Sequence, residues 1–115
     1  MKIDHLEIKN FNFIGLNSDS KGDIVFYGKT YFFGKHVGSL TQQDDNELSL
    51  HEESEVLGNI TGDIIHIHGN IKGDVRANKV LNAYSGAVVE GDIFAKNFNI
   101  HPGAIIKGNI NSLSD

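Results

Sequence analysis

A short motif that repeats along the chain constrains its fold more than any other feature. The motif is Gly, then Asn or Asp, then Ile or Val, and it occurs seven times between residues 22 and 110. An alternating apolar stretch recurs around the glycine roughly every 17 residues, a period typical of solenoids, whose units stack because none can bury its apolar face alone. The glycines that anchor this repeat are Gly22, Gly38, Gly58, Gly73, Gly91 and Gly108.

Alternation with a period of two within each repeat predicts β-strands. Ile71, Gly73 and Val75 fall on one face of the chain, and Lys72 and Asp74 fall on the other. Stacked copies would bury a ladder of aliphatic side chains, each contributing about 1.5–3 kcal/mol. The residues expected in this ladder are Ile60, Val75, Ile93 and Ile110.

The sequence therefore predicts an all-β, single-domain β-helix (solenoid) of about six rungs, with roughly three short strands in each rung. The length of 115 residues suits one domain. We assign residues 14–110 to the β-helix core, 1–13 to a leading segment or tail, and 111–115 to a short polar tail.

The composition argues against several classes of function. The chain has no cysteine, which removes disulfides and thiolate-ligated metals. A net charge of −5 with a single arginine argues against a nucleic-acid partner. There is no signal-peptide or membrane-helix stretch, so a cytoplasmic location is expected. Because no P-loop, dinucleotide fingerprint or hydrolase elbow occurs, we expect no enzyme, no catalytic residues and no cofactor.

Three stretches of the chain resemble the core of the bactofilin family. Residues 14–24 are similar to its opening, 56–77 to its middle and 98–108 to its closing rung. The resemblance implies a right-handed β-helix that assembles into filaments without a nucleotide. It also implies a cytoskeletal scaffold at the inner face of the cytoplasmic membrane, with cell-wall peptidases or synthases as partners and a role in cell shape. The chain departs from the family in its short flanks and at Ile106, where an aromatic residue is common.

The two ends of a β-helix expose unpaired backbone groups, which can template another chain. Few residues follow Ile110, so the cap at that end is thin, and apolar residues occur near both ends. We expect self-association into a homopolymer through Phe11, Phe13 and Ile14 at one end, and through Ile105, Ile106 and Ile110 at the other.

Three further features are candidate contact sites. Phe94 falls on the outward phase of its strand and suggests a lateral contact. The basic and apolar residues 9–14 suggest a weak contact with the inner membrane. The acidic stretch 44–55 is expected to be a solvated loop or a docking surface for a basic partner. His66 and His68 share one face of a strand, but the spacing places no third ligand, so no metal site is expected.

Two alternatives stay open at this point. One is an acyltransferase built as a left-handed β-helix of hexapeptide repeats, in which residues 102–106 would suit the coil and His101 could act as a base. The uneven intervals between the anchor glycines break the steady phase that such a coil needs. The other alternative is a non-polymeric β-helix adaptor for cell-wall enzymes, which solution mass would separate from a filament.

Overall fold

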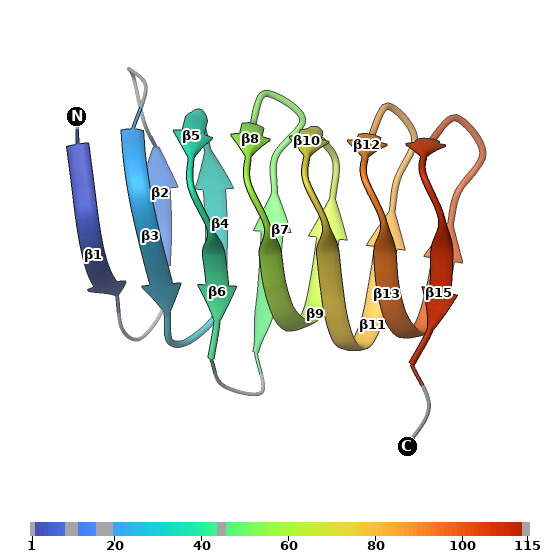
Figure 1. The fold of residues 1–115 in the computed structure, drawn as a ribbon, viewed down its shortest axis with the longest axis horizontal. Coiled ribbons are helices and arrows are strands. Elements are labelled where there is room, and N and C mark those ends of the chain that lie inside the picture. Colours follow the sequence, from blue (N-terminus) through green and yellow to red (C-terminus); the bar gives the residue numbers. More distant parts are fainter. Residues whose placement is uncertain (1, 9–11, 16–19, 44–45, 114–115) are drawn as a thin grey trace.

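The computed structural model describes residues 2–8, 12–15, 20–43 and 46–113. Over these residues the chain forms fifteen β-strands and no helix. The strands pair in parallel, and the chain coils as a right-handed β-solenoid of about five turns, stacked along the long axis in Figure 1. The described residues therefore contain no helix long and apolar enough to cross a membrane.

Each complete turn lies over three faces that meet at corners. The first face consists of β5 (Lys35–Val37), β8 (Glu55–Leu57), β10 (Asn70–Lys72), β12 (Val88–Glu90) and β14 (Ile105–Lys107). The second face contains the second half of β3 (Ser20–Phe26), β6 (Leu40–Gln42), the first halves of β9 (Ile60–Ile67), β11 (Val75–Ala83) and β13 (Ile93–Ile100), and β15 (Ile110–Ser112).

The third face combines separate strands with strands that continue around a bend from the second face. It consists of β2 (Asn12–Gly15), β4 (Thr30–Phe33), β7 (Glu47–Leu50) and the second halves of β9, β11 and β13. In β11 the pairing register shifts between Ala77 and Val80, where the strand turns from the second face to the third. At the N-terminal end, β1 (Lys2–Ile8) pairs with β3.

The expected all-β, right-handed coil is confirmed, and the number of rungs differs slightly from the expectation. About six rungs were expected, and the solenoid has about five turns. Six anchor glycines enclose five intervals, so a count of glycines exceeds the count of complete turns by one. A left-handed coil, on which the acyltransferase alternative depends, is not the coil that this chain forms.

The core is a set of inward-facing columns that run along the solenoid axis. In one column Leu40, Ile60, Val75 and Ile93 are register partners on successive turns, and all four are buried. Parallel neighbours lie about 4.8 Å apart, so each side chain packs on its equivalents above and below. The aliphatic column is continuous because the repeat places the same residue type at the same register position in each turn.

The corner between the first and second faces explains the Gly-Asx motif. At Gly73 the backbone φ is +151°, and an added Cβ would overlap the carbonyl oxygen of Gly58. The following Asp74 presents its amide to the Oδ1 of Asn59 at 3.0 Å, and its own Oδ1 accepts the amide of Asp92 at 2.9 Å. Glycine is needed for the close approach of the turns, and the Asx side chain satisfies the next turn's amide.

Candidate self-assembly surfaces

The last turn of the solenoid ends in two unpaired strand edges. Among the described strands, β14 pairs only with β12 and β15 pairs only with β13. Both edges face away from the body of the molecule, at the end opposite β1 in Figure 1. Unpaired backbone donors and acceptors of this kind can accept a strand from another chain.

The inward columns of the solenoid emerge at this same end. Ile110 continues the column of Ile93 but is 48% exposed, and Ile100 continues the column of Ala83 but is 40% exposed. Ile106 follows the buried Val89 and is only partly buried against the core. The end of the solenoid is therefore an apolar cross-section of its core.

Ile105 lies near this cross-section but not in it. Its register partner Val88 is on the outward side of the first face, and Ile105 is 49% exposed. Of the three isoleucines expected at this end, Ile106 and Ile110 belong to the inward columns and Ile105 belongs to the lateral surface beside them.

The corner column of Asx residues also reaches this end. Asp92 accepts the amide of Asn109 at 3.1 Å, as Asp74 accepts that of Asp92 one turn earlier. In the described part of the chain no further turn follows to present an amide to Asn109. This end therefore exposes the three features that join one turn to the next inside the solenoid. They are apolar side chains of the inward columns, backbone groups of strand edges and an Asx side chain.

Comparison with known proteins decides the family. The family model described as "Bactofilin: Polymer-forming cytoskeletal" matches residues 12–111. This chain belongs to the bactofilin family. It is accordingly a polymer-forming cytoskeletal protein, and the family is a structural one. No curated protein and no solved structure matches the chain.

The N-terminal end of this bactofilin is less fully described than the C-terminal end. Phe13 and Ile14 lie in β2, in register with Tyr31 and Phe32 of β4. Phe11 lies outside the described residues. Among the described strands, β2 pairs only with β4 and β1 only with β3, so this end also finishes in strands with one recorded neighbour.

Phe94 lies on the second face of the bactofilin, in an outward column. Its register partners are Arg76 on one side and Asn111 on the other, and its side chain is half-buried. Phe94 therefore lies on the outer surface of the second face rather than in the core.

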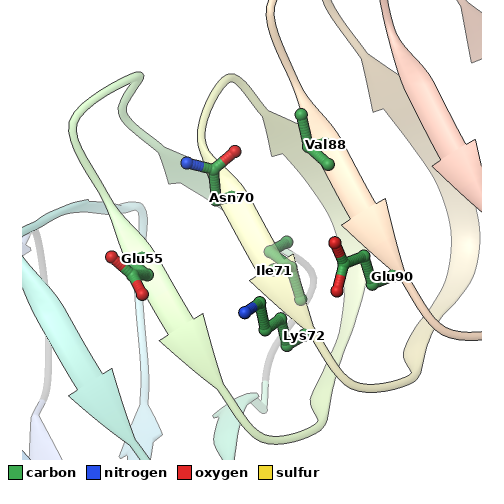
Figure 2. Close-up of a pocket in the computed structure, with 6 residues that line it drawn as sticks. All are labelled: Glu55, Asn70, Ile71, Lys72, Val88 and Glu90. Atoms are coloured by element: carbon green, nitrogen blue, oxygen red, sulfur yellow. The ribbon is translucent and has the colours of Figure 1, made fainter.

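The first face carries an alternation of charges along the axis. A hollow of about 260 Å³ lies on this face. Figure 2 shows that Lys72 of β10 lies between Glu55 of β8 and Glu90 of β12 at this hollow. At either side, Lys35 approaches Glu55 at 3.9 Å and Lys107 approaches Glu90 at 3.7 Å. These ion pairs are largely exposed, and each contributes about 0–1 kcal/mol. The hollow brings together no arrangement of nucleophile and base.

The histidines of the third face are engaged with other side chains. The Nε2 of His66 lies 2.7 Å from Oε1 of Glu47, and its Nδ1 lies 2.9 Å from the hydroxyl of Tyr84. The hydrogen bond from His66 lowers the pKa of the Glu47 carboxyl below its usual range. His68 instead stacks on the Tyr84 ring at 4.3 Å. No group of three metal-ligating side chains occurs among the residues that the structure describes.

Sequence reasoning missed one feature of this surface. A column of aromatic and imidazole rings runs parallel to the solenoid axis along the corner where the third-face strands end. It is formed by Phe33, His51, His68, Tyr84 and His101. These residues recur at nearly the interval of the repeat, and each follows the last residue of a third-face strand or ends one. That spacing is the signal that could have found the column.

Proposed function

We propose that this bactofilin assembles end to end into filaments without a nucleotide, as a non-enzymatic cytoskeletal scaffold. One observation carries the proposal: Ile110 continues the column that buries Ile93, yet it remains 48% exposed at an unpaired strand edge. A second molecule stacked on this end would continue both the column and the sheet. The interface we propose comprises Phe11, Phe13 and Ile14 at one end, and Ile106 and Ile110 at the other, with Ile105 at its lateral edge and Ile100 as an addition from the structure.

Several small contributions to the free energy would stabilise the contact between two stacked molecules. Burying the remaining apolar surface of Ile100, Ile106 and Ile110 would contribute about 1 kcal/mol each. Pairing the β14 and β15 edges adds backbone hydrogen bonds, each contributing about 0.5–1.5 kcal/mol. Both gains arise from the same stacking step, and neither requires a bound nucleotide.

The cellular setting is also part of the proposal. We place the filament in the cytoplasm, with residues 9–14 in weak contact with the inner face of the membrane and Phe94 in lateral contact between filaments. Cell-wall peptidases or synthases are the proposed partners, organised by the scaffold to set cell shape. These assignments rest on the family and on the outward position of Phe94.

Negative-stain electron microscopy of the purified protein, with no nucleotide or metal added, tests the proposal. We expect long filaments of uniform width, and light scattering that rises with protein concentration. Discrete particles of small, fixed mass would contradict end-to-end assembly and would favour the non-polymeric adaptor instead.

A further inference from the structure

The ring column on the third-face corner is interrupted at one point. Phe33 lies 4.3 Å from His51, and farther along the axis His68, Tyr84 and His101 stack at 4.3 and 4.8 Å. Among the described residues no ring contact joins His51 to His68, although the two follow neighbouring strands β7 and β9. Tyr84 has both ring faces covered, whereas at the interruption the rings are not stacked on one another.

The interruption coincides with a difference in turn length. After His51 the chain makes a turn that includes Glu52 and Glu53 before β8 begins, whereas after His68 only Gly69 precedes β10. A Cβ at Gly69 would overlap the backbone and side chain of Ser54. The short turn that follows His68 therefore lies in close contact with the longer turn that follows His51. The two corners therefore do not superimpose, and their histidine rings do not stack.

A hollow of about 180 Å³ lies beside this interruption. It is lined by Tyr31, Phe33, Ser49, His51 and His68. Ser49 lies between Tyr31 and His66 in an outward column, and its small side chain leaves the space open. A second, more open hollow on the same two histidines is completed by Glu52. The size suits one planar group rather than a whole small-molecule ligand, since ligand pockets usually exceed about 300 Å³.

The hollow is bordered by acidic residues on the side of the turn that follows His51. Between Lys35 and Lys72 the chain has no lysine or arginine and has seven acidic residues. Glu52 and Glu53 are exposed on the turn next to His51, whereas Glu47 on β7 is already engaged by Lys29 at 3.6 Å and by His66 at 2.7 Å. Burial, together with the neighbouring His66 and His51, lowers the pKa of His68, which favours the neutral form of its ring.

We propose that this hollow binds the guanidinium group of an arginine carried by a basic, extended segment of a partner protein. A guanidinium is planar and cationic, so it can lie against the rings of Phe33 and His51 while its N–H groups reach the carboxylates of the turn. A cation already lies against a ring at the edge of the hollow, since the ammonium of Lys29 is 5.6 Å from the centre of the Tyr31 ring. The proposal does not depend on filament assembly.

Fluorescence anisotropy with three labelled peptides tests directly whether the protein prefers a planar cation. The peptides share the sequence Gly-Lys-Gly-X-Gly-Lys-Gly, in which X is arginine, lysine or citrulline. Citrulline keeps the planar shape without the charge, and lysine keeps the charge without the plane. We expect binding by the arginine peptide to be about 3- to 10-fold tighter than by either of the others, the range that a cation–π contact supports. Equal affinities would overturn the proposal, because they would show general electrostatic attraction only.

Two variants locate the binding site. Ser49→Phe fills the hollow, and we expect it to abolish the preference for arginine. Asn99→Phe is the matched control, because Asn99 occupies the same outward column on β13, away from the hollow, and there the preference is retained. Circular dichroism confirms that both variants fold. An unchanged preference in Ser49→Phe would place the arginine elsewhere and overturn the assignment. If Arg76→Ala tightened peptide binding, the natural occupant would be a second copy of this chain, and the assignment to a partner protein would fail.

Discussion

Ile93 and Ile110 are register partners on the last two turns of the solenoid, yet Ile93 is fully buried and Ile110 is 48% exposed. The two residues have the same side chain and occupy the same column. They differ only in that a further turn covers Ile93. Substitutions at these two positions therefore separate the stability of the coil from its ability to assemble.

A charge at Ile93 should unfold the protein. In Ile93→Asp an unpaired carboxylate would replace a buried side chain that packs between Val75 and Ile110. Burial of such a charge costs several kcal/mol, a large fraction of the total stability of a domain. We expect loss of the cooperative thermal transition in circular dichroism. A native-like melt would show that this column does not form the core.

A charge at Ile110 should leave the coil folded and shorten its filaments. Ile110→Arg places the guanidinium at an exposed edge, where the monomer can solvate it but a stacked second molecule cannot. Filament length in electron micrographs is the measurement, with a melting temperature within a few degrees of the parent as the folding check. Val37→Arg is the matched control, since Val37 is 38% exposed on the lateral surface of the first face. Filaments of Ile110→Arg as long as those of Val37→Arg would contradict the end contact.

The fold could be predicted largely from its repeat. Residues such as Ile60 and Val75 recur at equivalent positions with period-two neighbours, and a stacked coil is the arrangement that buries all of them. The handedness could not be obtained from the spacing and came only from the family resemblance. The continuity of β11 across two faces was also not predictable, because the consecutive polar residues Asn78 and Lys79 interrupt the alternation and suggest a break between two short strands.

The candidate sites were less predictable than the fold. Ile105 and Ile106 are adjacent in sequence, but strand alternation sends Ile106 inward and Ile105 to the lateral surface. The stacking of Tyr84 between His68 and His101 depends on turns of unequal length, which bring residues 16 and 17 positions apart into register. Sequence alone does not set that register.

The glycine column gives a paired test of backbone geometry. Gly73→Ala introduces a Cβ that would overlap the carbonyl oxygen of Gly58, at a φ of +151°. Gly86→Ala also introduces a residue at positive φ, +92°, but its Cβ meets no atom within 4 Å. We expect Gly86→Ala to cost about 1–2 kcal/mol from backbone strain alone.

The cost of Gly73→Ala should be clearly larger than that of Gly86→Ala, because the turns must separate locally in addition to the backbone strain. Urea denaturation of the two variants measures the difference in the free energy of unfolding. Equal losses of stability would show that the close approach of Gly73 to Gly58 does not constrain the coil.

A buried histidine makes the stability of the solenoid depend on pH. His36 lies in an inward column on β5, in register with Val56, and its ring packs edge-on against Phe32 at 6.1 Å. Burial lowers the pKa of His36 below its usual 6.5, and the opposing effects of Gly22 and Asp23 are smaller. The unfolded chain therefore takes up a proton more readily than the folded chain. The stability from neutral His36 is fully present above about pH 6.5 and declines as the pH falls toward the folded pKa, by about 1.4 kcal/mol for each pH unit between the two values.

His36→Val should remove this dependence, because valine is the residue that the next turn places in the same column. We expect the free energy of unfolding of the parent to fall more steeply than that of the variant between about pH 7 and pH 5. Urea titrations at several pH values measure both curves, and the histidines that the two proteins share cancel in the difference. Curves that stay parallel over this range would show that His36 is not the group whose protonation opposes folding.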